Sequence, residues 1–200
     1  HHKDRNTGDV TIKIEGKIFK VHKDILIDRI PFFRGLFNSN MLECTQEEID
    51  LTPPFSELDY SAFDLLLNYA YTGLLIMSFS NVQNLMMGAN FLNMESVVEE
   101  CIQFIKRHLD IDVALPFLFF CRSIGYNEVD DYVLRFFDKN FVPISYTAEF
   151  LELLFEDLRT FLQRDNLNVD HEKQASLYND GKRNIYKKNR NNKKTSKDVN

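Results

Sequence analysis

The beginning of the chain alternates between apolar and polar residues. Val10, Ile12 and Ile14 are separated by polar side chains, which is the period of a strand with one buried face. Gly16 follows as a turn residue, and residues 18–21 resume an apolar run of the β type. The pattern predicts a β-hairpin with one face against the core.

After the hairpin the period of the apolar residues changes to that of helices. Residues 22–30 are amphipathic, and Pro31 suits the first position of a second helix. A short strand is predicted around Ile49 and Leu51, and Gly73 suits a left-handed helix end. The later predicted helices span residues 58–71, 80–92 (opened by a capping box, Ser80 to Gln83), 95–109, 113–124, 128–139, 148–155 and 158–163, with a last candidate from Asp170.

The order of these elements predicts an α+β fold followed by an all-α part. Strands occur only in the first half, where a short β-sheet flanked by helices is expected, and the chain turns wholly helical near residue 112. Beyond Tyr178 the residues are mostly Asn, Lys and Arg, which bury too little apolar surface to offset the entropy of ordering. Residues 179–200 are therefore predicted to form a disordered basic tail.

The net charge of −6 conceals a difference between these parts. Eight Lys and Arg lie beyond residue 180 against the single Asp198, whereas residues 1–180 carry 16 basic and 29 acidic side chains. An acidic body argues against nucleic-acid binding, although the tail alone could act as a nuclear-localisation or nucleic-acid patch. The polar first residues resemble no signal peptide, and the apolar runs are too short to cross a membrane. We expect a cytoplasmic protein, with a nuclear location left open.

No pattern in the chain indicates catalysis or a cofactor. Cys44, Cys101 and Cys121 are widely spaced and are interpreted as reduced structural thiols, not as a disulfide or metal framework. His22 has no partner at metal-ligand spacing and is interpreted as structural. Phosphate-binding glycine loops, a Gly-x-Ser-x-Gly elbow and a His-Glu-x-x-His motif are absent from the sequence. The chain is predicted not to be an enzyme, with no cofactor, no bound metal and no small-molecule substrate.

Several short motifs, taken in order, resemble a BTB (POZ) domain over residues 8–111. The motifs that carry the resemblance are Asp9-Val10, Phe19 to Lys23, Leu26, Phe33-Arg-Gly-Leu-Phe37 and Phe63 to Gly73, continued by Asn81-Val82, Leu85, Ala89, Phe91-Leu92 and Cys101. Each is common alone, and their specificity comes from the shared register.

Residues 112–178 resemble part of the BACK segment of kelch-like proteins. Asn166-Leu-Asn-Val169 followed by Glu172 is similar to a signature of that segment, and Gly125-Tyr126 lies where one of its helices ends. Where such proteins continue with a Trp-bearing helix, this chain has Asp180-Gly-Lys-Arg and further basic residues. We therefore expect a partial BACK segment with no kelch propeller.

The resemblance implies a homodimeric adaptor that recruits a cullin-3 ubiquitin ligase scaffold by binding the amino-terminal region of cullin-3. Met41, Leu42 and Glu43 occupy the position where cullin-binding members carry a hydrophobic residue, any residue and Glu, and Tyr69 and Tyr71 would line the same face. A flexible Met can fill an apolar pocket of a partner while Glu43 pairs nearby.

The resemblance also implies a dimer face on the first helices. Asp9 and Lys23 match positions of a charged pocket at the BTB dimer interface, with an ordinary surface pair as the alternative. Residues 32–37 contain three Phe and one Leu, more apolar side chains than one helix face can bury. This density favours a dimer contact over a core role alone. The predicted dimer contacts are Asp9, Lys23, Leu26, Phe32, Phe33, Leu36 and Phe37.

Two other functions stay open at the level of the sequence. The dimer could bind a corepressor peptide as a transcriptional scaffold, although no zinc-finger array accompanies it. A chain without a propeller could also pair with other BTB proteins and dilute the substrate binding of full-length kelch-like relatives.

Overall fold

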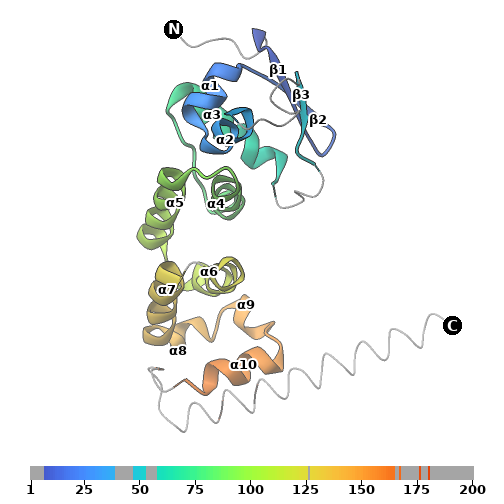
Figure 1. Ribbon diagram of the computed structural model, residues 1–200. Coiled ribbons are helices and arrows are strands. Elements are labelled where there is room, and N and C mark those ends of the chain that lie inside the picture. Colours follow the sequence, from blue (N-terminus) through green and yellow to red (C-terminus); the bar gives the residue numbers. More distant parts are fainter. Residues whose placement is uncertain are drawn as a thin grey trace, which may run out of the picture. The chain divides into compact units, whose positions relative to one another are not determined.

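The computed structural model describes most of the chain, and the described residues form two compact units (Figure 1). The units are His1–Arg107 and His108–Asn200, and each is described by itself. The described residues are 7–38, 47–52, 58–125 and 127–164, with the isolated positions 167, 176 and 180. Most of the Asn166 to Glu172 signature, the candidate helix from Asp170 and the tail lie outside them, as does Cys44.

The first unit contains a three-stranded sheet. Its strands β1 (Val10–Ile14), β2 (Lys17–Val21) and β3 (Glu48–Asp50) lie in the order β2-β1-β3, with β1 antiparallel to β2 and parallel to β3. Glu15 and Gly16 join β1 to β2 with φ angles of 49° and 76°, the two positive values that a tight hairpin turn requires. The predicted hairpin is confirmed.

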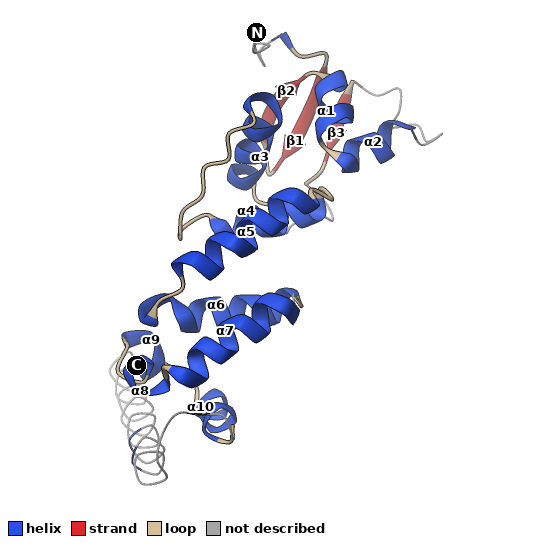
Figure 2. Cartoon of the chain, turned by 90° about the vertical axis from the view of Figure 1, so that its left-hand side faces the viewer, coloured by secondary structure: helices blue, strands red, loops and turns tan. Residues whose placement is uncertain are grey.

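Five helices accompany the sheet within the first unit (Figure 2). They are α1 (Lys23–Arg29), α2 (Pro31–Asn38), α3 (Tyr60–Thr72), α4 (Val82–Phe91) and α5 (Glu95–His108). The alternation of β1 places Val10, Ile12 and Ile14 on its buried face, where Ile12 and Ile14 have no exposed surface. Phe19 of β2 contacts Phe63 of α3 edge to face, with the ring centres 5.1 Å apart, so the apolar face of the sheet packs on α3.

Side chains at both ends of α3 fix its length. At its start the Asp59 carboxylate accepts hydrogen bonds from the backbone N–H groups of Ser61 and Ala62, so the helix begins two residues later than the predicted Leu58. At its end Gly73 is left-handed, with φ 72°, as its sequence position predicts. Asn84 of α4 donates to the other Asp59 oxygen at 3.0 Å, and Asp59 thereby also ties α4 to α3.

The predicted capping box at the start of α4 is wrong. The N-cap is Asn81 and not Ser80, and no side chain caps the helix. The Asn81 amide instead turns back, accepting from the Ser78 N–H at 2.8 Å and donating to the Ile76 carbonyl at 3.2 Å. Local side-chain bonds of this kind compete with capping.

The described part of the second unit is helical. Its helices are α6 (Ile111–Ile124), α7 (Asn127–Lys139), α8 (Phe141–Ile144), α9 (Ala148–Leu151) and α10 (Phe155–Leu162). With its three-stranded sheet in the first unit, the chain has the α+β fold class predicted from the sequence. No helix in the described ranges is long and apolar enough to span a membrane.

The helix boundaries in the second unit differ from the prediction at several points. Helix α6 begins at Ile111 because Asp110 caps it through the N–H groups of Asp112 and Val113. The predicted helix over residues 148–155 ends at Leu151, and α10 begins at Phe155 and not at the predicted Leu158, because the backbone is extended at Leu154. The short helix α8 was missed, and Pro143 within it hid its helical character in the sequence.

Phe side chains hold these short helices together. The Phe137 ring of α7 lies 4.7 Å from that of Phe161 in α10 and 5.6 Å from that of Phe141 in α8. Phe141 in turn contacts Phe150 of α9 at 5.5 Å. Helices of a few residues are unstable alone, and this aromatic cluster supplies the burial that stabilises them.

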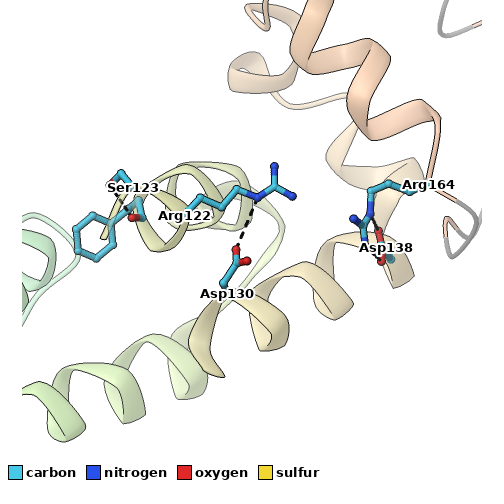
Figure 3. A network of polar contacts seen from close by, with 6 residues as sticks. Arg122, Ser123, Asp130, Asp138 and Arg164 are labelled. Atoms are coloured by element: carbon cyan, nitrogen blue, oxygen red, sulfur yellow. Dashed lines mark hydrogen bonds and ion pairs between the residues drawn. The ribbon is translucent and has the colours of Figure 1, made fainter. Parts of the chain in front are cut away.

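A buried ion pair joins α7 to the residues that follow α10 (Figure 3). Arg164 donates two hydrogen bonds of 2.7 Å to the Asp138 carboxylate, which is 5% exposed. The pKa of the Arg164 guanidinium is raised, mainly by its hydrogen bonds to Asp138. Figure 3 also shows Arg122 and Asp130, whose closest charged atoms are 3.7 Å apart.

The Asp138 pair yields a stability prediction. Arg164→Met leaves a buried carboxylate without its counter-charge, and we expect a loss of about 3 kcal/mol in the free energy of unfolding. The double variant Asp138→Leu, Arg164→Met removes both charges and is expected to recover most of that loss. Urea unfolding followed by circular dichroism measures both. A double variant as unstable as Arg164→Met would contradict the account.

The Asp59 cap yields a prediction about pH. Hydrogen bonds from Ser61 hold the pKa of Asp59 below its usual value. Its contribution is therefore complete above the unfolded-state pKa of about 4 and is lost as the pH falls through the lowered folded-state pKa. At neutral pH, Asp59→Ala should cost about 1 kcal/mol of unfolding free energy.

The matched control for this prediction is Asp59→Asn. It keeps an oxygen that can cap α3 but has no charge to titrate. The urea midpoints of Asp59→Asn and the unmodified chain should differ at neutral pH. The two midpoints should converge as the pH falls toward about 3, below the ordinary aspartate pKa. A separation that does not change with pH would contradict the assignment.

Candidate functional site

The surface made by α1 and α2 contains most of the residues predicted to contact a second chain. Helix α2 is anchored at its start, where the Phe32 N–H donates to the Leu92 carbonyl at 3.1 Å. Arg34 holds α1 and α2 together by donating to the Ile27 and Asp28 carbonyls at the end of α1, at 3.0 and 2.9 Å. The sequence analysis missed Arg34, although a cation near a helix carboxyl end is a known stabilising pattern.

Three of the predicted dimer contacts belong to the core of this chain. Leu26 and Phe33 have no exposed surface, and Phe37 is 7% exposed. Phe33 lies between the rings of Phe37 and Phe63, at 6.1 and 6.4 Å. We correct their assignment to core residues, since a second chain could reach them only if this packing changed. The density of Phe here reflects a core shared by α2 and α3.

Two of the predicted contacts retain accessible surface. Phe32 and Leu36 lie on the other side of α2 and are half-buried. The Phe32 ring is supported by Phe33 at 5.2 Å and by Phe91 at 5.1 Å. This support fixes the orientation of an apolar ring at the surface of α2.

Asp9 and Lys23 meet at the start of α1. The Asp9 carboxylate accepts a hydrogen bond of 2.8 Å from the backbone N–H of Lys23, the first residue of α1. The Lys23 ammonium lies 4.5 Å from the centre of the Phe37 ring, a cation–π contact. Both residues thus stabilise the start of α1.

Tyr71 and His22 form a bridge between α3 and the start of α1. The Tyr71 hydroxyl accepts from the His22 backbone N–H at 2.8 Å and lies 2.9 Å from His22 Nδ1. His22 Nε2 lies 3.1 Å from the Thr7 hydroxyl. Both ring nitrogens thus have a neighbour, which agrees with the structural role predicted for His22.

Tyr69 and Tyr71 do not form one patch. Residues two apart on a helix point to different sides, and Tyr71 is directed to His22. Tyr69 instead lines a cavity of about 660 Å³ together with Asp28 and Met94. The three other predicted cullin contacts, Met41, Leu42 and Glu43, lie outside the described residues.

Two strongly exposed aliphatic side chains of the first unit were missed by the sequence analysis. Leu74 and Ile76 follow α3 and are 69% and 62% exposed, whereas Leu75 and Met77 are half-buried. The alternation is that of a strand, yet these residues form neither helix nor strand. The apolar run directly after Gly73 was the signal that could have revealed them.

The described residues show neither a metal cluster nor a reactive thiol. They contain no cluster of His, Cys, Asp or Glu that could hold a metal ion. Burial raises the pKa of the Cys101 and Cys121 thiols to about 12, so neither supplies a thiolate at neutral pH. Both cysteines are free, as the sequence predicts.

Comparisons with known proteins identify both units. Residues 2–109 match the model of the BTB/POZ domain family, and residues 114–178 match that of the BACK family, described as "BTB And C-terminal Kelch".

The curated relatives are kelch-type proteins. Human Kelch repeat and BTB domain-containing protein 8 is 32% identical over 165 residues, which cover 82% of this chain and 27% of the relative. Human Kelch repeat and BTB domain-containing protein 12 is 30% identical over 82% of the chain and 26% of the relative. Mouse Kelch-like protein 28 is 29% identical over 80% of the chain and 28% of the relative.

The chain spans about a quarter of the length of these relatives, and that quarter carries the sheet, the α1–α2 surface and the helices that follow. The family match covers more than half of the chain and agrees with the order of its strands and helices. The protein therefore belongs to the BTB/POZ family and carries, after its BTB domain, a BACK segment related to those of kelch-like proteins.

Proposed function

We propose that this protein is an interaction adaptor that dimerises through its BTB domain and recruits a cullin-3 ubiquitin ligase scaffold. The observation that carries the proposal is the exposure of Leu74 and Ile76 within a BTB domain, at 69% and 62%. Adjacent apolar side chains at a surface mark contact sites for other proteins more often than chance exposure does.

The α1–α2 surface supports the same proposal. Phe32 and Leu36 present half-buried apolar surface on a helix whose position Arg34 and the Leu92 carbonyl fix. A contact surface held rigid before binding loses little entropy when a partner docks. Dimer interfaces built from one repeated patch bury such apolar residues at their centre.

The cullin-binding half of the proposal rests on the family resemblance. Met41 to Glu43 occupy the matching sequence position between α2 and β3. Recruitment of a large scaffold needs no chemistry from the adaptor, which agrees with the absence of a metal cluster among the described residues.

Dimerisation is tested by placing charges on the exposed apolar residues. Leu74→Asp together with Ile76→Asp should turn a dimer into a monomer, because each would bury a carboxylate in an apolar contact. Light scattering reads the mass directly. Leu151→Asp with Leu154→Asp is the matched control, since those leucines are 58% and 72% exposed in the second unit.

Two results would contradict the dimer proposal. One is a monomeric unmodified chain at all concentrations measured. The other is a dimer that survives the changes at Leu74 and Ile76 while circular dichroism shows an intact fold.

Cullin binding is tested by calorimetry with an amino-terminal fragment of cullin-3. The unmodified chain should bind with a dissociation constant of about 1 μM or below. Met41→Asp with Glu43→Lys should abolish the binding heat and leave the dimer intact, because it reverses the charge and removes the apolar contact. Glu15→Gln in the hairpin turn is the charge-matched control, because it raises the net charge by one, as the double variant does. No binding by the unmodified chain would overturn this half of the proposal.

A further inference from the structure

A groove runs between the outer strand of the sheet and the first turns of α3. It measures about 860 Å³ and is lined on one side by residues 17–20 of β2 and on the other by Tyr60, Asp64 and Leu65. We call it the edge groove. It is separate from the α1–α2 surface and from the exposed Leu74 and Ile76 on which the proposed function rests.

The backbone at the floor of the edge groove has free hydrogen-bonding capacity. Thr11 and Lys13 bond to the β3 side, through the Glu47 carbonyl and the Leu51 N–H. The alternate residues of β1 therefore face β2, and the opposed Ile12 and Phe19 form a hydrogen-bonded pair. Within β2 the residues between such pairs, Ile18 and Lys20, direct their peptide groups away from β1.

No described strand pairs with this outer side of β2, which ends the sheet order β2-β1-β3. Figure 2 shows α3 beside β2 at this edge. An edge strand next to a helix is the arrangement in which extended peptides add to a sheet. Lysines protect many edge strands from pairing with another copy, and Lys17 and Lys20 can do so here, yet Ile18 between them is 64% exposed.

The charges of the edge groove indicate what would fill it. Lys17 and Lys20 make no ion pair with another described residue. The Lys17 ammonium lies 5.3 Å from the centre of the Tyr60 ring, and Tyr60 is 42% exposed. Asp64 is the one acidic residue among the described residues that line the groove, within a chain of net charge −6. The groove is a locally basic and apolar site on an acidic protein.

A second copy of this chain fits the groove poorly. Pairing two β2 edges around a two-fold axis would place four lysines along one short seam, and like charges in adjacent strands are destabilising. The chain's own residues 182–197 are basic and would be repelled as well. An acidic occupant satisfies the lysines, and an extended one satisfies the peptide groups of Ile18 and Lys20.

We propose that the edge groove binds an extended acidic peptide of a partner protein, which adds to β2 as a fourth strand. Its backbone bonds to Ile18 and Lys20. On the α3 face of β2 an apolar side chain packs on Tyr60 and Leu65 beside a carboxylate that faces Lys17. On the opposite face, to which the alternation of the strand directs Lys20, a second carboxylate faces that lysine. The site would give this adaptor a second means of holding a partner, independent of the dimer.

The test uses the full chain and a short blocked peptide in which pairs of glutamates alternate with pairs of valines, so that both faces of the added strand carry carboxylates. Fluorescence anisotropy should show binding of this labelled peptide that weakens with added salt. Lys17→Glu with Lys20→Glu should weaken it by about tenfold or more. The matched control, Lys106→Glu with Lys139→Glu, has the same charge change outside the groove and should leave binding unaltered.

A second variant separates strand addition from simple charge attraction. Ile18→Pro removes one outward N–H, a change that edge strands tolerate, and should abolish peptide binding while circular dichroism remains unaltered. If this variant instead disturbs the fold, slowed amide exchange of Ile18 and Lys20 in the unmodified chain with peptide gives the same readout.

Three results would overturn the proposal. The first is that the unmodified chain binds the glutamate–valine peptide no better than a matched lysine–valine peptide. The second is binding with no change in the exchange of the Ile18 and Lys20 amides. The third is self-association through this edge, seen as a loss of mass in light scattering when Lys17 and Lys20 are replaced by glutamate.

Discussion

The small sheet has one apolar face, and covering that face is the constraint on which the first unit depends. Ile12, Ile14 and Val21 are fully buried, and burial of each such side chain stabilises a fold by about 1.5–3 kcal/mol. Three strands cannot provide this burial by themselves. Helix α3 provides it through Phe63, and α2 adds Phe33 behind it, so the positions of both helices follow from the sheet. Asp59, which caps α3, and Arg34, which joins α2 to α1, then fix which side chains of these helices stay at the surface.

The candidate contact surfaces are what this packing leaves over. Helix α2 uses Phe33 and Phe37 for the core, and Phe32 and Leu36 are consequently left on its outer side. The strand β2 has β1 on one side only, which leaves the edge groove open among the described residues. The segment after Gly73 exposes Leu74 and Ile76 for the same reason, since no described element covers them. The protein thus combines a rigid core with apolar surfaces that fit a role in binding other proteins, as the BTB family match indicates.

Local patterns in the sequence predicted the hairpin, the α+β class and the left-handed Gly73, because each depends on residues close together in the chain. The same reasoning failed where distant residues compete. The Ser80 capping box has the right residues, but the Asn81 side chain bonds to Ile76 and Ser78 instead. Leu26 and Phe33 were assigned to a dimer face because of the family resemblance and the density of apolar residues, neither of which shows which surface buries a given side chain. Leu154 shows a third limit, since its extended backbone separates α9 from α10, whereas the sequence pattern placed it inside the first of two predicted helices.

Hydrogen exchange of the backbone amides at residues 74–77 tests the central claim most directly, since that claim is that a second chain covers this segment. In the structure of the single chain these residues belong to no helix or strand, so a monomer should exchange them quickly. The account predicts slow exchange at concentrations where the chain is dimeric and fast exchange on dilution to the monomer. Fast exchange at every concentration, in a chain that light scattering shows to be dimeric, would place the dimer contact elsewhere and contradict the account.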